Sequence, residues 1–192
     1  MRSRALLVLV LLGGCGSVES VRVRSDYDVV DRSRTFRVVV VTAPLPAGDE
    51  AVGELWSLIA RRYVNQHRDF IVARHLAAGT PPADVCADKT EAVLWLKPKV
   101  GRAKSRVWAA VQARLLRCSD GKAIWEAEAK GRWDEVDPTV RELTARYREE
   151  LGPSVAPWVP ATFHLLRETL DTLPYPRLVR DEDVMEKIEL GE

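Results

Sequence analysis

Two stretches of alternating apolar and polar residues, separated by a turn at residues 119–121, constrain the fold of this chain most strongly. Paired as antiparallel strands with Val107 opposite Trp133 and Leu115 opposite Trp125, they place only apolar residues and glycine on one face. Gly121 suits the left-handed position of a three-residue hairpin turn. One face of this hairpin is therefore predicted to belong to the core, and the other to face water.

The water-facing side of the predicted hairpin is charged and carries one large aromatic residue. In the same register Arg132 lies opposite Trp108, where a cation–π contact is possible, with Leu116 and Ile124 nearby. The charged pairs predicted on this face are Arg114 with Glu126 and Arg106 with Asp134. An aromatic side chain rimmed by arginine has the composition of an interaction hot spot, although a covering helix explains the pattern equally well.

The sequence before the hairpin predicts a βαβ unit. The β-branched run 35–42 is typical of a strand buried on both faces, and an apolar stripe predicts a helix over residues 49–67. Residues 70–74 predict a return strand, which can run parallel to the first. Residues 91–97 predict a further strand that joins the hairpin through a turn near Gly101. Its register stays open, because either of its two alternating apolar faces suits the core.

The sequence after the hairpin predicts two helices. Asp137 can cap the first with Pro138 in its opening turn, and the second covers about residues 160–173. The expected fold class is α+β (or α/β), a mixed, mostly antiparallel sheet of about five strands with helices packed on one face. Residues 35–178 are long enough for one domain with a substantial core.

The N-terminal segment has the order of a secretory signal. Two arginines precede the apolar residues 5–12, and small residues then lead to Cys15. The apolar run is too short to cross a bilayer, which takes about 20 apolar residues. We expect residues 1–14 to be a signal peptide and residues 15–34 to be a charged tether.

Residues 12–15, LGGC, resemble the bacterial lipobox, in which the cysteine thiol receives a diacylglyceryl group before cleavage. The resemblance implies a lipoprotein held at a membrane by lipid on Cys15, and Gly16 after it implies the outer membrane, facing the periplasm. Residues 173–190, LPYPRLVRDEDVMEKIEL, resemble lipoproteins of unknown activity from myxobacteria and spirochaetes. The element order is loosely similar to the curli-secretion and penicillin-binding-protein-activator lipoproteins, a similarity that carries no functional residues across.

Two further cysteines, Cys86 and Cys118, form an even pair once Cys15 is acylated. In an oxidising compartment such a pair favours a disulfide, with two separate buried thiols as the alternative. A zinc site has less support, because two cysteines without nearby histidine do not make a zinc ligand set.

The charge balance gives no indication that this protein binds polyanions such as nucleic acids. The chain has 29 basic and 28 acidic residues, and loss of Arg2 and Arg4 with residues 1–14 leaves 27 basic residues against 28 acidic ones. We therefore predict no nucleic-acid partner and no polybasic membrane patch. No cofactor motif is present in the sequence, and we expect no cofactor.

The titratable residues point to no particular reaction. His67, His75 and His164 lie far apart in sequence and outside any zinc-hydrolase spacing. Residues 101–105 superficially resemble a phosphate loop, but a β-turn explains them. The acidic residues of the segment 179–192 lack the spacing of a calcium loop, so we expect a solvated acidic tail, either a short helix or a disordered end.

Two functional hypotheses follow. The first is a lipid-anchored, non-enzymatic periplasmic module that binds or assembles another envelope component. Its candidate partner surface comprises Trp108, Arg132, Leu116, Ile124, Val184, Met185 and Ile188. The alternative is an envelope hydrolase whose carboxylates Glu91, Glu126 and Glu128 converge only in the fold.

Overall fold

A computed structural model describes residues 16–46, 49–77, 85–87 and 89–191 of the chain. Its centre is a six-stranded mixed sheet with the strand order β1-β6-β5-β4-β2-β3. The strands are β1 (Gly16–Val23), β2 (Arg37–Thr42), β3 (Ile71–Leu76), β4 (Ala92–Ala103), β5 (Arg106–Arg117) and β6 (Ala123–Asp134). Among these strands only β2 forms parallel pairs, with β3 and β4, so the predicted α+β fold with a mostly antiparallel sheet is confirmed.

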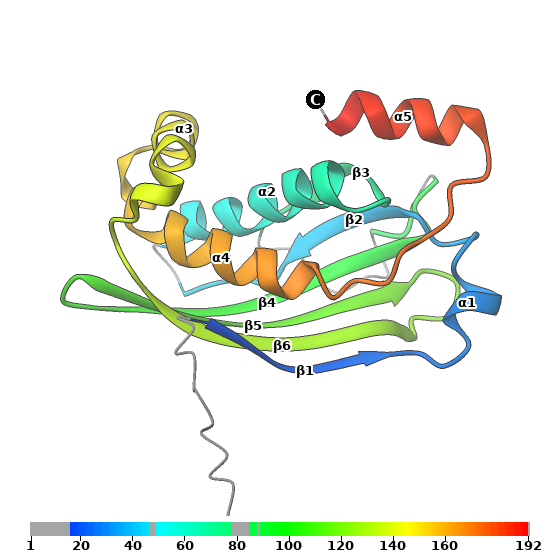
Figure 1. Cartoon of the computed structure of the whole chain (residues 1–192), viewed down its shortest axis with the longest axis horizontal. Helices are drawn as coiled ribbons and strands as arrows, with labels where there is room; N and C mark the ends of the chain where they lie inside the picture. Colours follow the sequence, from blue (N-terminus) through cyan, green and yellow to red (C-terminus); the bar gives the residue numbers. More distant parts are fainter. Residues whose placement is uncertain (1–15, 47–48, 78–84, 88, 192) are drawn as a thin grey trace, which may run out of the picture.

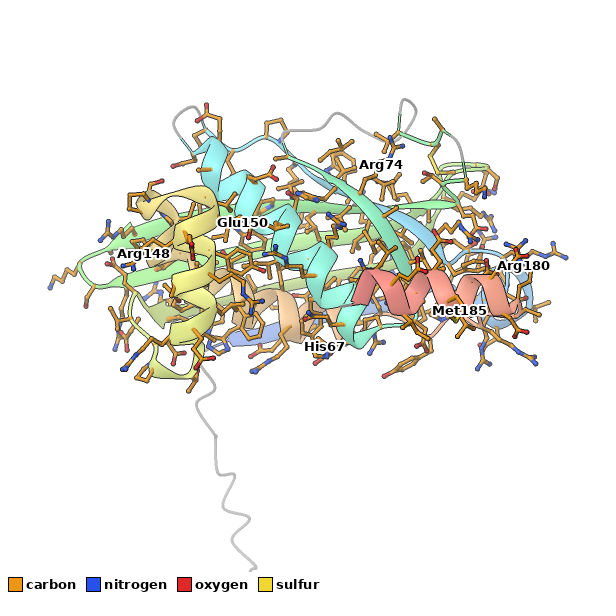
Figure 2. The ribbon with its side chains drawn as sticks, turned by 90° about the horizontal axis from the view of Figure 1, so that it is seen from above. His67, Arg74, Arg148, Glu150, Arg180 and Met185 are labelled. Atoms are coloured by element: carbon orange, nitrogen blue, oxygen red, sulfur yellow. A yellow bond between two sulfur atoms is a disulfide. The ribbon has the colours of Figure 1, made fainter. Side chains whose placement is uncertain are left out.

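The helices form a layer on one face of the sheet (Figure 1). The elements of this layer are α2 (Glu50–His67), the 3₁₀ turn η2 (Pro138–Val140), α3 (Arg141–Leu151), the 3₁₀ segment η3 (Pro153–Trp158), α4 (Val159–Leu170) and α5 (Asp181–Gly191). Helices α2 and α4 cover the sheet, whereas α3 and α5 lie on either side of α2 (Figure 2). The short helix α1 (Tyr27–Val30) lies at one end of the sheet (Figure 1). The opposite face of β1, β6 and β5 carries no helix among the described elements.

The register predicted for the hairpin is confirmed. Strands β5 and β6 pair Val107 with Trp133 and Leu115 with Trp125, and the apolar face between these pairs is buried in the main core. Gly121 has a φ of 69°, so it takes the left-handed conformation that the turn requires. On the outer face the predicted Arg114–Glu126 and Arg106–Asp134 pairs form ion pairs at 3.0 and 3.2 Å.

Strand β4 is longer than predicted and is buried on both faces over its first half. Leu94 and Leu96 face the main core, whereas Val93 and Trp95 pack in a second apolar cluster on the other face. This explains why its register could not be read from the sequence. The turn that follows lies at residues 104–105, with Lys104 at a φ of 57°, so Gly101 lies within the strand and not in the turn.

The predicted βαβ unit is present, with β3 parallel to β2 after the long helix α2. Val38 and Val40 belong to the main core and Val39 and Val41 to the second cluster, so strand β2 is buried on both faces as expected. Asp49 precedes α2 but makes no side-chain capping bond. Asp137, in contrast, accepts a hydrogen bond from the backbone N–H of Thr139 and caps η2 as predicted.

The prediction of a tether is wrong for residues 16–23. These residues form β1, an edge strand whose backbone pairs with β6 from Gly16 opposite Gly131 to Val23 opposite Trp125. Val18, Val21 and Val23 are interspersed with polar and charged residues, and a β-bulge between Val18 and Ser20 interrupts the alternation, so a strictly alternating pattern does not reveal this edge strand. Residues 16–23 therefore belong to the folded unit. Residues 1–15, with the predicted signal peptide and Cys15, lie outside the described residues.

Candidate functional site

The water-facing side of β4, β5 and β6 carries a patch built around Trp108. Trp108 lies opposite Gly101 of β4 and Arg132 of β6, and the next row of the sheet sets Lys99, Ala110 and Lys130 side by side. We call these six residues the Trp108 patch. The helix layer lies on the opposite face of the sheet (Figure 1), so the alternative of a covering helix does not apply to the described elements. Trp108 keeps 41% of its surface exposed.

The indole of Trp108 lies over Gly101. A Cβ atom added at Gly101 would lie 2.1 Å from the indole Nε1 atom, far inside van der Waals contact. Gly101 is therefore a close-approach site, where the absence of a side chain lets the neighbouring aromatic ring lie against the backbone. Ala110 adds a second small residue in the adjacent row, so that the ring is bordered by small side chains.

The rim of the patch is cationic. Lys99, Lys130 and Arg132 are all exposed. Lys130 pairs with Glu19 of β1 at 2.6 Å, whereas Lys99 and Arg132 have no ion pair with any described residue. The predicted cation–π contact between Arg132 and Trp108 is absent from the described contacts, although four other cation–π pairs are present. Arg132 and Lys99 are thus available to a partner.

Two residues predicted to adjoin Trp108 on this surface are buried. Leu116 is 8% exposed and Ile124 is 1% exposed, so both are excluded from the partner surface. Leu116 is opposite Val93 of the second apolar cluster, whereas Ile124 is moved by a β-bulge at the end of the hairpin, where Leu116 pairs with Ala123 in place of Ile124. The extra residue turns the Ile124 side chain into the main core. The strict alternation used for the prediction cannot reveal such a bulge.

Val184, Met185 and Ile188 are exposed as predicted, but they lie on α5. Helix α5 belongs to the helix layer (Figures 1 and 2), on the other side of the sheet from Trp108. The predicted partner residues therefore form two separate surfaces and not one.

The acidic segment forms the short helix that was one of its two predicted alternatives, but it is not simply a solvated tail, because charged groups anchor α5 to the fold. Arg37 of β2 donates to Asp183 at 2.7 Å and to Glu186 at 2.6 Å, and only 1% of the Asp183 side chain is exposed. Lys187 donates to the carbonyl oxygens of Val64 and Phe70 at 3.0 and 2.7 Å. Burial lowers the pKa of Lys187 to about 8. Hydrogen bonds from Arg180, and then from Arg37, lower the pKa of Asp183 to about 2.

The histidines have structural partners and lie apart. His75 contacts Glu54 and His164 contacts Asp137, each at 2.7 Å between Nε2 and a carboxylate oxygen, while His67 contacts the ring of Tyr63. No group of three histidine, cysteine or acidic residues within the described ranges could hold a metal ion.

The three carboxylates of the hydrolase hypothesis do not converge. Glu91 accepts the backbone N–H groups of Phe36 and Arg37 at 2.7 and 2.9 Å, and so fixes the start of β2. Glu126 and Glu128 lie on β6 and have cross-strand partners, Arg114 and Gln112. Glu91 lines a cavity of about 550 Å³ beside the disulfide, and neither of the other two reaches it. The hydrolase hypothesis thereby loses its geometric basis.

Cys86 and Cys118 form the predicted disulfide, with their Cα atoms 5.5 Å apart. The bond joins the segment before β4 to the end of β5. Both cysteines pack against the second apolar cluster, formed by Val39, Val41, Val85 and Val93.

No family model and no curated protein matches the chain. Among solved structures, the PelC dodecamer from Paraburkholderia phytofirmans is 15% identical, with a TM-score of 0.49; the match covers 84% of this chain and 99% of that one. The dodecamer of a single-residue variant of that PelC is also 15% identical, with a TM-score of 0.41, and the match covers 74% and 95% of the two chains. Likeness at this level carries no argument about function, which must come from the residues of this chain.

Proposed function

We propose that this chain is a lipid-anchored protein of the bacterial cell envelope, acylated at Cys15, that binds another envelope component without catalysing a reaction. Its binding surface is the Trp108 patch. The observation that carries the proposal is the exposed indole, which rests on Gly101 and is rimmed by unpaired cations on a sheet face without helices among the described elements.

The composition of the patch suits the recognition of a partner protein. Tryptophan and arginine are the residues that most often dominate binding energy, particularly where an aromatic ring fills a pocket on the partner. The free charges of Lys99 and Arg132 favour a partner that presents carboxylates around an apolar pocket. Small neighbours at Gly101 and Ala110 leave the ring accessible from the side as well as from above.

The location in the envelope rests on the N-terminal sequence. The signal-like residues 1–14 and the LGGC lipobox support acylation, and we propose the outer membrane, facing the periplasm, as the site of the anchor. None of the described helices is long and apolar enough to cross a membrane. In this proposal, which rests on the lipobox, the lipid on Cys15 holds the protein at the bilayer.

The anchor is tested by intact mass. Protein extracted from membranes without reductant should have the mass of a chain that starts at Cys15 and carries a diacylglyceryl or triacyl group. The Cys15→Ser variant should lack this adduct and leave the membrane fraction. An unmodified wild-type chain would contradict acylation at Cys15. The role of the Trp108 patch would not be affected by that result, because it is tested by a separate crosslinking experiment.

The patch is tested by site-specific crosslinking in cells. A photoreactive residue at Ala110 should give one discrete adduct with an envelope protein, and the adduct should disappear when Trp108→Ser is added. The same photoreactive residue at Val29, which is 87% exposed on α1, is the matched control. Equal adducts from both positions, or an adduct that survives Trp108→Ser, would reject the patch as the binding surface.

A further inference from the structure

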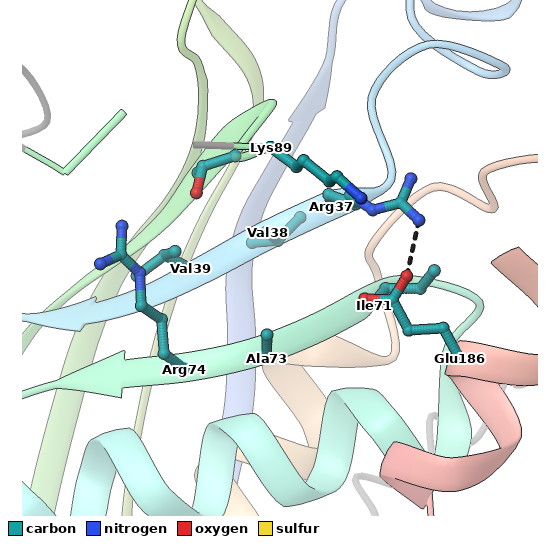
Figure 3. Close-up of a pocket in the computed structure, with 9 residues that line it drawn as sticks. Arg37, Val38, Val39, Ile71, Ala73, Arg74, Lys89 and Glu186 are labelled. Atoms are coloured by element: carbon teal, nitrogen blue, oxygen red, sulfur yellow. Dashed lines mark hydrogen bonds and ion pairs between the residues drawn. The ribbon is translucent and has the colours of Figure 1, made fainter. Parts of the chain in front are cut away.

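A cavity of about 360 Å³ lies between β2, β3 and α5, remote from the Trp108 patch (Figure 3). Its volume falls within the range of small-molecule sites, about 300–1,000 Å³. The lining includes Val39 and Ile71, both buried, together with the exposed Ala73. This part of the cavity offers an apolar surface for a hydrocarbon group.

The rest of the lining is predominantly cationic. Arg37, Arg74 and Lys89 contribute three positive charges, and Glu186 is the single acidic residue among them. Glu186 is already bound to Arg37 (Figure 3), so it does not neutralise the other two cations. Arg74 and Lys89 have no ion pair with any described residue, which leaves two uncompensated charges beside an apolar surface.

The cationic groups come from separate elements that the fold holds in place. Arg74 donates to the carbonyl oxygen of Val85 at 2.9 Å, and Val85 precedes Cys86, whose disulfide fixes this segment to the end of β5. Arg37 is held by both Asp183 and Glu186. The charges of Arg37 and Arg74 are therefore positioned before a ligand binds, which lowers the entropic cost of binding.

We propose that this cavity binds a small anionic amphiphile, an unbranched hydrocarbon chain that ends in a carboxylate or a phosphate. The chain would lie against Val39, Ile71 and Ala73, and the head group would accept hydrogen bonds from Arg74, with Lys89 as a second positive charge farther along the cavity (Figure 3). Guanidinium and ammonium groups bind both head groups, whereas a neutral head group would leave the two charges without a counter-ion. The proposal does not depend on acylation of Cys15 or on the Trp108 patch.

The test uses calorimetric titration of the chain from residue 15 with Cys15→Ser and the disulfide intact. The probes are decanoate and dodecyl phosphate, below their micelle concentrations, with neutral decyl maltoside and inorganic phosphate for comparison. We expect at least one of the two anionic amphiphiles to bind, and which of them binds more tightly identifies the head group. Arg74→Gln should weaken binding about tenfold, since it removes a charge-assisted hydrogen bond, and Lys89→Gln should weaken binding by a smaller factor, since it removes only a more distant positive charge.

Two further variants separate the cavity from general surface binding. Ala73→Phe places bulk in the cavity and should abolish binding of the amphiphiles, while Arg148→Gln, an exposed cation on α3, should leave it unchanged. The urea midpoint of each variant checks that it is folded. Binding of decyl maltoside as tight as that of the anions, binding of inorganic phosphate as tight as that of dodecyl phosphate, unchanged affinity in the two charge variants, or no binding at all would overturn the proposal.

Discussion

At the scale of single residues, Gly101 decides how Trp108 is presented. A strand interior is an unfavourable place for glycine, because glycine loses more backbone entropy on folding than other residues. Any other residue at this position would bring its Cβ into the indole ring. Glycine at position 101 therefore has an entropic cost, but it allows the Trp108 indole to lie over the backbone of β4.

Substitution Gly101→Ala should displace the Trp108 indole without unfolding the protein. The flexible ring can rotate away, and alanine removes part of the entropic cost, so we expect the free energy of unfolding to change by less than about 1 kcal/mol. The measurement is the indole N–H resonance of Trp108, assigned with Trp108→Phe, which should shift, and the crosslink from Ala110 should weaken. Gln112→Ala on the same strand is the control. An unchanged indole resonance would show that the ring does not rest on Gly101.

Asp183 predicts an acid-sensitive contact at the same scale. Its pKa of about 2 in the folded chain lies below the ordinary value of 3.8, so the stabilisation is complete above pH 3.8 and is lost as the pH falls toward 2. Methyl resonances of Val184 and Ile188 should report detachment of α5 over this range.

In Asp183→Asn the helix should already be loosened at pH 7, by about 1–3 kcal/mol, because Arg37 loses a buried charged partner. Glu182→Gln, at an exposed neighbouring position, should behave like the wild type. Identical pH profiles for Asp183→Asn and the wild type would contradict this role of Asp183.

At the scale of elements, the disulfide joins the segment before β4 to the end of β5. Cys86 and Cys118 are separated by 32 positions, and closure of a loop of this length stabilises a fold by roughly 3–4 kcal/mol on the chain-entropy relation. The double variant Cys86→Ala/Cys118→Ala should lose about this free energy of unfolding in urea. The wild type after reduction and alkylation should show a similar loss. A difference below about 1 kcal/mol would mean that the reduced chain is already held together by the second apolar cluster.

The elements that sequence predicted well are those with a strong and regular apolar pattern. Every second residue of β5 from 107 to 115 is apolar, and every second residue of β6 from 125 to 133 is apolar or glycine, so the register could be predicted although Trp108 and Ala110 interrupt the polar face of β5. Strand β1 was missed because its few valines are interspersed with polar and charged residues, a β-bulge interrupts the alternation, and only one side of the strand is paired. The docking of α5 depends on Arg37, some 146 positions before Asp183, and no local pattern reveals such a contact.

The candidate site was only partly predictable for the same reason. Trp108 and Arg132 lie where the alternation placed them, whereas a bulge moved Ile124 into the core. The role of Gly101 was missed, because its fit to the indole is visible only once β4 and β5 are paired. The cationic cavity adds α5 and the segment before β4 to the predicted β2–β3 pair, and no sequence pattern relates these two segments to that pair.

At the scale of the whole molecule, the sheet has two unlike faces. One face is buried under α2 and α4, and the other is open over β1, β6 and β5 and closed near β2 by the second apolar cluster. The two proposed sites lie on different parts of the sheet. The Trp108 patch lies on the open part, and the cavity lies beside β3, the edge strand at the other end of the strand order.

The start of β1 at Gly16 has a mechanical consequence for an acylated chain. Cys15 is the next residue in the sequence, and adjacent Cα atoms lie about 3.8 Å apart, so lipid on Cys15 would leave no slack between bilayer and sheet. Insertion of ten glycine and serine residues between Cys15 and Gly16 would add a reach of roughly 17 Å. It should leave the urea midpoint unchanged, because the pairing of β1 is kept, yet reduce the crosslink from Ala110 to a membrane-bound partner.

An undiminished crosslink in the spacer variant would show that partner binding does not depend on the distance between the sheet and the bilayer. An acylated chain with the natural spacing would be able to rotate about its anchor but not to extend away from the bilayer. Any partner of the acylated protein would then have to come within about the length of the sheet from the membrane surface.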